Sequence, residues 1–166
     1  MPKEKVKLPL HYWDTCNFLT ILKGDENGLQ GCIDVLNEAE KGNLLIVTSS
    51  LTLASIIKIG SQKQPALPES EESRKIELFF SHEYIVIREL ERKTAELSRR
   101  IAWDFGIKAF DAIHVATAIK SKVNYFETLD EGIIAKFQGQ LNDPFIEVRK
   151  PQISVKQTEL SFDDDE

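Results

Sequence analysis

The sequence predicts a three-layer α/β/α domain, in which helices cover both faces of a central parallel sheet of four to five strands. Short apolar runs, typical of buried strands, alternate along the chain with segments whose apolar residues recur at helical spacing. Because a strand–helix–strand unit favours a right-handed crossover, this alternation indicates parallel strands with helices on both sides of the sheet.

Four apolar runs and a candidate fifth are the predicted strands. They comprise residues 10–13, 44–47, 84–87 and 123–126, with 145–148 as the fifth. The first run stops at Asp14, and the second is bounded by Asn43 and Thr48. Runs this short and this apolar fit strands buried inside a domain.

The helices are predicted from apolar residues that lie three and four positions apart. They fall near residues 29–36, 53–57 (ending near Gly60), 76–80, 90–105 (followed by Gly106), 111–119 and 133–137. Residues 24–28 form a turn cluster, and residues 61–70, with two prolines, form a loop. The helix that Asp111 opens is apolar on more than one side, so we expect it to be deeply buried.

Length and composition set the broad class. The chain has 166 residues, the usual size of one domain, and its 42% apolar and 29% charged residues exclude a mainly disordered protein. No apolar run reaches the roughly 18–20 residues of a membrane span, and the first ten residues lack the apolar core of a secretory signal. With only Cys16 and Cys32 available, we expect reduced thiols and a cytoplasmic protein.

The net charge of −6 is concentrated near the end of the chain. Residues 151–166 carry −4, and the sequence finishes in Asp-Asp-Asp-Glu. We therefore expect a single domain over residues 1–150 and a flexible acidic tail over 151–166. The net charge of −6 argues against a protein that simply coats nucleic acid, but the nearly neutral body can still hold basic patches beside an acidic pocket.

Three acids point to a site at one edge of the predicted sheet. Asp14 follows the first strand directly, Asp130 follows the fourth within a few residues, and Asp111 begins the buried helix. Ligands of such sheets bind outside the carboxyl ends of the strands. Clustered carboxylates repel one another unless a cation lies between them, and their hard oxygens suit Mg²⁺ or Mn²⁺. The chemistry predicted for such a site is metal-assisted phosphodiester hydrolysis.

Each acid also has a simpler interpretation. Asp111 and Asp130 could each be the N-cap of the helix that follows, because aspartate is among the best capping residues. Asp14 is harder to explain in this way, since a carboxylate directly after an apolar strand is costly if it is buried without a partner.

Four segments of the chain, in order, resemble motifs of the PIN-domain nucleases, in the branch of VapC-like toxins. They are residues 12–19 (YWDTCNFL), 47–54 (VTSSLTLA), 110–118 (FDAIHVATA) and 126–130 (FETLD), and the third is the most specific. The matches extend over roughly residues 10–148. The resemblance implies a three-layer PIN fold and a metal-dependent endoribonuclease that is often the toxin of a toxin–antitoxin pair.

The resemblance also implies roles for particular residues. Asp14 and Asp111 would be the main Mg²⁺ or Mn²⁺ ligands, Asp130 would complete the site directly or through water, and Thr128 would orient it by hydrogen bonding. RNA would be the substrate, a small antitoxin would be the partner, and a homodimer is expected by analogy.

Ser55 departs from the family pattern. The family places a glutamate in the helix after the second strand, at the position that Ser55 occupies here. The site therefore lacks one charge, and we expect weaker metal affinity. Glu131 and Asp104 are acids that compensate for this loss only if the fold brings them near. The alternative function is a catalytically degenerate PIN domain that binds RNA or a protein without cutting.

Other residues near these motifs have more than one interpretation. His114 is either a packed core residue or a substrate contact, and Cys16 is expected to be structural because no base accompanies it. Basic residues either line an RNA path or are solvated: Arg99, Arg100, Lys108, Lys120 and Lys122. A haloacid-dehalogenase-like phosphatase would need a second acid two residues after Asp14, where this chain has Cys16.

Overall fold

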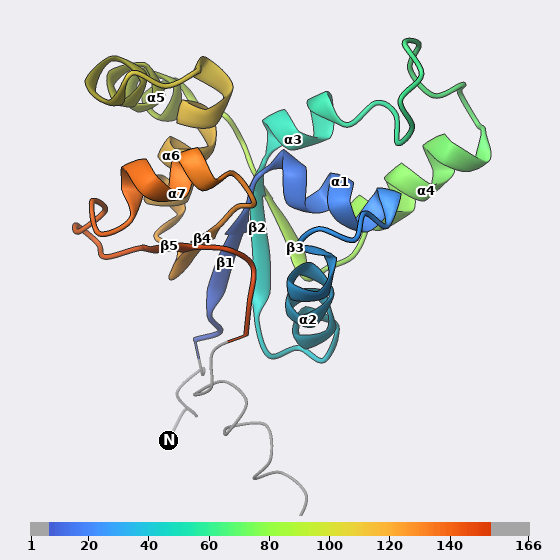
Figure 1. Cartoon of the computed structure of the whole chain (residues 1–166), viewed down its shortest axis with the longest axis horizontal. Coiled ribbons are helices and arrows are strands. Elements are labelled where there is room, and N and C mark those ends of the chain that lie inside the picture. The colour runs from blue at the N-terminus through green and yellow to red at the C-terminus, as the bar shows by residue number, and fades with distance from the viewer. Residues whose placement is uncertain (1–6, 154–166) are drawn as a thin grey trace, which may run out of the picture.

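A computed structural model describes residues 7–153, which fold into a five-stranded sheet between two layers of helices (Figure 1). The strands are β1 (Leu10–Trp13), β2 (Leu45–Ser49), β3 (Ile85–Arg88), β4 (Tyr125–Glu127) and β5 (Glu147–Arg149). The helices are α1 (Thr15–Lys23), α2 (Leu29–Glu40), α3 (Ser50–Ser55), α4 (Glu71–Phe80), α5 (Arg92–Phe105), α6 (Ala109–Ser121) and α7 (Glu131–Phe137). The predicted three-layer α/β/α class is confirmed, with five strands in the sheet.

All strand pairs are parallel, and the strand order is β3-β2-β1-β4-β5. β1 is the central strand, with Tyr12 opposite Val47 of β2 and Phe126 of β4. The chain leaves β1 for β2 on one side and later returns to place β4 on the other. This change of direction is the topological switch point at which parallel sheets bind ligands, beyond the carboxyl ends of the strands.

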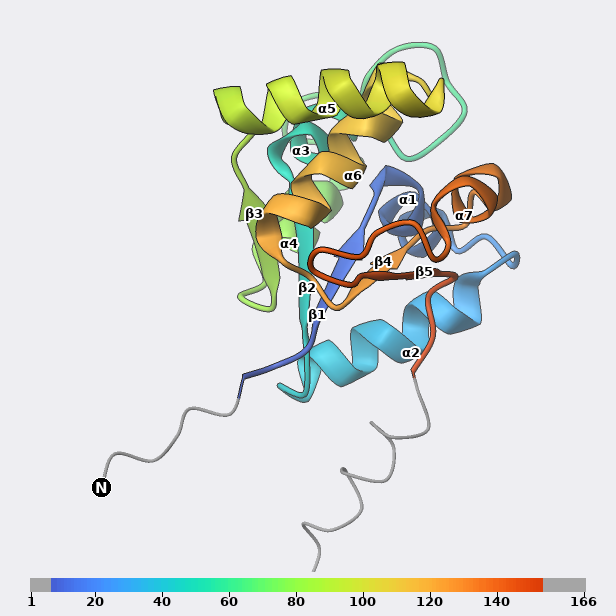
Figure 2. The same cartoon turned by 90° about the vertical axis from the view of Figure 1, so that its left-hand side faces the viewer.

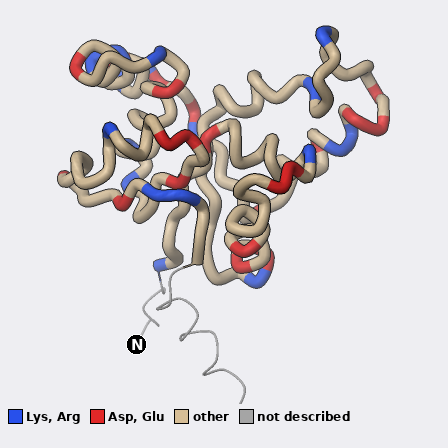
Figure 3. Tube along the Cα trace, viewed as in Figure 1, with Lys and Arg blue, Asp and Glu red and all other residues tan. Residues whose placement is uncertain are grey.

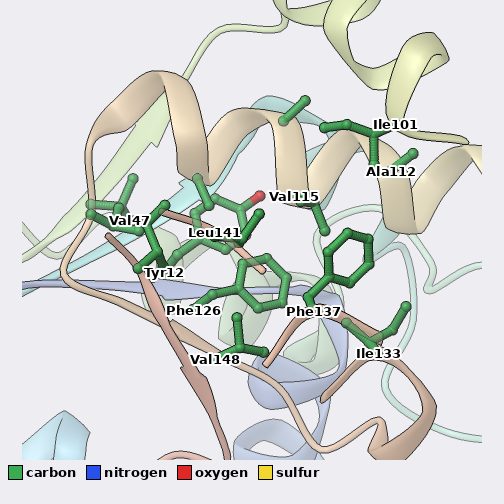
Figure 4. Packing of buried hydrophobic residues seen from close by; sticks show 14 residues of the cluster. Tyr12, Val47, Ile101, Ala112, Val115, Phe126, Ile133, Phe137, Leu141 and Val148 are labelled. Carbon is green, nitrogen blue, oxygen red and sulfur yellow. The ribbon is translucent and has the colours of Figure 1, made fainter. Parts of the chain in front are cut away.

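Two apolar cores lie on the two faces of the sheet. On one face, Tyr12 packs with residues of α5, α6 and α7, including Ile101, Val115 and Phe137 (Figure 4). On the other face, Trp13 packs with residues of α1, α2 and α4. Adjacent residues of β1 thus serve opposite cores, because side chains alternate along a strand. Figure 1 separates the two layers, with α5, α6 and α7 on the left of the sheet and α1, α2 and α4 on the right, and Figure 2 turns the layer of α5, α6 and α7 toward the viewer.

One predicted helix differs from the structure. The apolar residues Leu53, Ile56 and Ile57 predict a helix that ends near Gly60, whereas α3 begins at Ser50 and ends at Ser55. Ile56 is nevertheless buried in the core, in non-helical backbone. The apolar pattern therefore reported the burial of Ile56 and not its secondary structure. Similarly, β4 and β5 each begin two residues later than predicted.

The described part of the predicted acidic tail packs on the domain. Pro151 is buried, and its backbone carbonyl lies against Gly31 of α2. The Gln152 amide donates to Glu127 Oε2 over 3.2 Å. The acidic residues predicted to form a flexible extension lie outside the described residues. Within residues 7–153, no helix is both long and apolar enough to cross a membrane.

Candidate active site

A pocket of about 400 Å³ opens at the carboxyl edge of the sheet and contains four of the predicted site residues. These are Asp14 after β1, Asp111 in α6, Asp130 before α7 and Ser55 at the end of α3. The other residues of the lining are Thr15, Cys16, Leu19, Leu51, Phe110 and His114. In Figure 3, acidic positions gather near the middle of the molecule, where the two layers of helices meet the ends of the strands.

Asp14 is held by hydrogen bonds to both of its carboxylate oxygens. The Cys16 thiol donates to Oδ1 over 2.7 Å, and the Thr128 hydroxyl donates to Oδ2 over 2.5 Å. Burial raises the pKa of Asp14, and the two hydrogen bonds oppose that rise by stabilising the charged form. The carboxylate does not cap α1, although Asp14 occupies the N-cap position. Its two oxygens are therefore held by side chains, one from α1 and one from the residue that follows β4.

Thr128 is buried and connects Asp14 with Asp130. Its hydroxyl donates to Asp14 and also accepts the backbone N–H of Asp130 over 3.1 Å. The Asp130 side chain caps α7, because Oδ1 accepts the amides of Gly132 (2.9 Å) and Ile133 (3.2 Å). The interpretation of Asp130 as an N-cap is confirmed. Capping α7 occupies one of the two carboxylate oxygens of Asp130.

Asp111 lies in the first turn of α6 and is not its N-cap. That position belongs to Lys108, so the interpretation of Asp111 as an N-cap is wrong: α6 begins two residues earlier than the apolar pattern indicates. Burial and the charge of Asp130 raise the pKa of Asp111, while the charge of Lys108 opposes this. The three aspartates therefore influence one another across the pocket, since Asp111 in turn raises the pKa of Asp14.

Ser55 does not offer a free hydroxyl to the aspartates. Its Oγ donates to the Leu51 carbonyl one turn earlier in α3, over 2.7 Å. The two acids considered as replacements lie outside the pocket lining. Glu131 is exposed and contacts Lys150 Nζ at 3.1 Å, and Asp104 contacts Arg100 Nε at 3.4 Å. The fold brings neither of them to the position of the missing glutamate.

His114 is a packed residue with both ring nitrogens in contact with hydroxyl groups. Nδ1 lies 2.7 Å from the Tyr12 hydroxyl, and Nε2 lies 3.3 Å from Thr15 Oγ1. Desolvation lowers the pKa of His114 to about 4, so the ring is neutral near pH 7. Of the two interpretations of His114, the structure supports the packed core residue.

Cys16 has the properties of a structural thiol. Burial and the adjacent Asp14 charge raise the pKa of Cys16 well above its usual range, and they outweigh the opposite influence of a helix N-terminus. A thiol that stays protonated donates a hydrogen bond and does not act as a nucleophile. Its role in the pocket is to hold Asp14.

The sequence analysis did not identify a buried polar cluster directly behind the pocket. Glu127, at the end of β4, is fully buried and accepts hydrogen bonds from Trp13 Nε1 (3.2 Å) and Arg149 Nε (3.3 Å). His11 Nδ1 lies 2.8 Å from the same carboxylate, and the Asn17 side chain donates to the Glu127 carbonyl. The sequence signal for this cluster is Glu127 itself, an acid directly after the apolar run 123–126, at a position where a buried strand usually has an apolar residue.

The donor types in the pocket fit a hard divalent cation. Asp14, Asp111 and Asp130 offer only carboxylate oxygens. Burial raises the pKa of Asp14 and of Asp111, and a neighbouring carboxylate adds to each rise, so a bound cation would relieve both effects. Within residues 7–153, however, no three His, Cys, Asp or Glu side chains are arranged as a preformed metal cage. This agrees with the absence of a glutamate at Ser55.

The basic residues considered as an RNA path fall into separate groups. The Arg99 guanidinium lies over the Trp103 ring at 5.3 Å, and Arg100 contacts Asp104. Lys120 and Lys122 line another cavity, of about 380 Å³, between β3, α5 and α6. Of these basic residues, Lys108 is the one whose charge acts on the acidic pocket, through Asp111.

A parallel α/β/α fold with clustered carboxylates at the switch point defines a class of hydrolases and binding proteins that act on phosphate groups. The family model that matches the chain narrows this class: residues 12–138 match the PIN domain. The chain belongs to the PIN-domain family, whose members are generally metal-dependent nucleases.

Two solved structures share this fold. One is a toxin–antitoxin complex from Klebsiella pneumoniae, with a TM-score of 0.59 and 19% sequence identity over 87% of this chain and 99% of that one. The other is VapBC2 from Rickettsia felis bound to a DNA fragment from its promoter, with a TM-score of 0.57 and 15% identity over 84% of this chain and 98% of that one. No curated protein matches the sequence.

Proposed function

We propose that this chain is a metal-dependent endoribonuclease of the VapC-like branch and the toxin of a toxin–antitoxin pair. The observation that supports this most strongly is the pocket at the end of β1, which Asp14, Asp111 and Asp130 all line. The match to the PIN domain supports a nuclease, and the similarity of the fold to two toxin–antitoxin proteins supports the toxin branch.

In this mechanism the chain provides a fixed set of carboxylates. Asp14, oriented by Cys16 and Thr128, and Asp111 would hold Mg²⁺ or Mn²⁺, and Asp130 would contribute directly or through water. A bound ion of this kind supplies a Lewis acid and a water of lowered pKa. The neutral His114 adds no charge to the pocket, and Lys108, whose charge acts on Asp111, would be available to a substrate phosphate. Hydrolysis would leave a 5′-phosphate and a 3′-hydroxyl.

The test is a cleavage time course on a mixture of structured RNAs with Mg²⁺ and with Mn²⁺. Asp14→Asn should lower the rate by about 100-fold or more, because it removes a charge that acts on the transition state. Asp104→Asn is the matched control, since that exposed acid pairs with Arg100 outside the pocket. Equal rates for the unchanged chain and Asp14→Asn would overturn the proposal.

A second candidate function rests on Ser55. Because its hydroxyl is bonded to Leu51 and no other acid replaces the missing glutamate, the domain could bind RNA or a protein without cutting. Ser55→Glu restores the family residue at a position that lines the pocket. A chain that binds RNA but cuts it only after Ser55→Glu would support the binding module over the nuclease.

An exposed apolar groove supports the toxin half of the proposal. It has a volume of about 560 Å³ and lies between α3, the following loop and α4, where Leu53, Ile57 and Phe80 contribute to its lining. Leu53 and Ile57 are 42% and 53% exposed, which fits a surface that a protein partner covers. A small antitoxin encoded beside this gene should co-purify with the chain, and Leu53→Asp should release it.

Two further expectations belong to the same proposal. A homodimer is expected by analogy with the family, and sedimentation of the purified chain tests it. A cytoplasmic location is expected from the sequence. Cys16 and Cys32 are both free thiols, which supports a reducing compartment.

A further inference from the structure

The lining of the acidic pocket includes residues that the carboxylate chemistry does not use. Three of them are apolar: Leu19 of α1, Leu51 of α3 and Phe110 of α6. Leu19 and Leu51 are partly buried, whereas Phe110 is 65% exposed. The pocket therefore combines acidic and apolar groups, and the most exposed of the three apolar residues is aromatic.

Exposure alone is not the argument, because single exposed apolar residues are common on protein surfaces. Position is what distinguishes Phe110. It directly precedes Asp111 in the first turn of α6, and both residues line the same pocket. Phe145 has almost the same exposure, at 63%, but it precedes β5 at the opposite edge of the sheet and lies outside the pocket.

A lysine, an aromatic ring and a carboxylate lie within residues 108–111, at the start of α6. Lys108 is the exposed N-cap residue, Phe110 is in the first turn, and Asp111 reaches the acidic side of the pocket. A nucleotide whose phosphate is held at the carboxylates carries its base only one sugar away. A flat apolar surface at that distance is suited to stacking with an unpaired base.

We propose that Phe110, which shares the pocket lining with Leu19 and Leu51, is a stacking platform for an unpaired nucleobase next to the phosphate at the acidic pocket. This inference rests on the proposed function and adds a base subsite to it. Stacking tolerates any base, because every base has a π-face, so the platform positions the substrate without selecting a sequence. Paired bases inside a duplex cannot reach the ring, and the subsite therefore favours loops and single strands.

The test is the affinity for a short fluorescein-labelled single-stranded RNA of mixed sequence, measured by anisotropy with Ca²⁺ and checked for intact RNA. Phe110→Ala should raise the dissociation constant by about 5- to 150-fold, the loss of one stacked base. Phe110→Trp should keep the affinity, because indole also stacks. Phe145→Ala is the matched control and should bind like the unchanged chain.

A scan of the RNA with single abasic sites separates stacking from a general loss of structure. An abasic site at one position of the RNA should weaken its binding to the unchanged chain. The same abasic site should not weaken RNA binding to Phe110→Ala any further. This inference would be overturned if Phe110→Ala and the unchanged chain bound the RNA with equal affinity. It would also be overturned if Phe110→Ala lost the binding of a protein partner but not of RNA. If RNA is still cut in either case, the nuclease proposal stands. If the unchanged chain neither binds nor cuts RNA, both proposals fail.

Discussion

The thiol of Cys16, at the start of α1, donates a hydrogen bond over 2.7 Å to Oδ1 of Asp14, which lies two residues earlier in the chain. This contact stabilises the charged form of a carboxylate whose pKa is raised by burial. Cys16, which the sequence predicts to be structural, is therefore part of the support for an acid.

Replacing Cys16 should change the pH dependence of cleavage. Cys16→Ala removes the donor, so the pKa of Asp14 should rise further and the low-pH limb of the cleavage profile should move to higher pH. Cys16→Ser keeps an O–H donor and should restore the original profile. The measurement is the cleavage rate as a function of pH for the three proteins. An unchanged limb in Cys16→Ala would contradict the account of this hydrogen bond.

Asp111 should destabilise the metal-free protein at neutral pH. Burial and the Asp130 charge raise the pKa of Asp111 in the folded chain above its ordinary value of 3.8. The free energy of unfolding therefore falls as pH rises from 3.8 through the raised pKa of Asp111. In this pH range the unfolded chain loses the Asp111 proton more readily than the folded chain does. Asp111→Asn should melt at a higher temperature than the unchanged chain in EDTA at neutral pH, and the difference should shrink toward pH 4.

Added Mg²⁺ or Mn²⁺ supplies the control for that comparison. An ion that binds only the folded carboxylates stabilises the unchanged chain in proportion to its occupancy. The advantage of Asp111→Asn should therefore narrow or reverse as the metal concentration rises. A variant that is less stable than the unchanged chain in EDTA, and equally so with metal, would show that Asp111 is structural.

Glu127 should be essential for folding stability. Its removal leaves Arg149, which is 7% exposed, without its buried carboxylate partner. Breaking a buried pair in this way costs about 3–5 kcal/mol, so Glu127→Ala should lower the free energy of unfolding by that amount. The control is Glu147→Ala, a half-exposed acid 3.7 Å from Arg149, which should cost less than about 1 kcal/mol. Chemical denaturation measures both, and equal losses would contradict the prediction.

Gly31 should not tolerate a methyl group, although it lies within α2. A Cβ at Gly31 would overlap the backbone carbonyl of Pro151. Gly31→Ala should lower the free energy of unfolding by about 1–3 kcal/mol, even though alanine favours a helix interior by roughly 0.5–1 kcal/mol. The neighbouring exposed change Gln30→Ala should stay within about 0.5 kcal/mol. A stabilised Gly31→Ala would mean that residues 151–153 do not pack against α2.

The sequence analysis predicted the layers and the place of the site because both follow from local patterns. Strand–helix alternation determines a parallel sheet, and acids that follow β1 and β4 must reach its carboxyl edge. The contacts that hold those acids were not predictable in the same way. Thr128 reaches Asp14 across 114 positions of sequence, and the Glu127 carboxylate, in β4, finds its partners on two other strands, β1 and β5.

The differences between prediction and structure have a common physical cause. Apolar spacing does not separate a buried residue in a helix from one in other backbone, so it placed the buried Ile56 in a helix that ends one residue earlier. Ser55 shows the same limit at the site. Its position in the pocket follows from the family motif, but the direction of its hydroxyl depends on the carbonyl of Leu51.

The most direct test of the central claim is the rate at which the unchanged chain produces 5′-phosphate ends from RNA at saturating Mn²⁺, compared with Asp14→Asn. The account predicts measurable cleavage that requires the metal and that falls by about 100-fold or more in the variant. Cleavage that persists at the same rate in Asp14→Asn would contradict it.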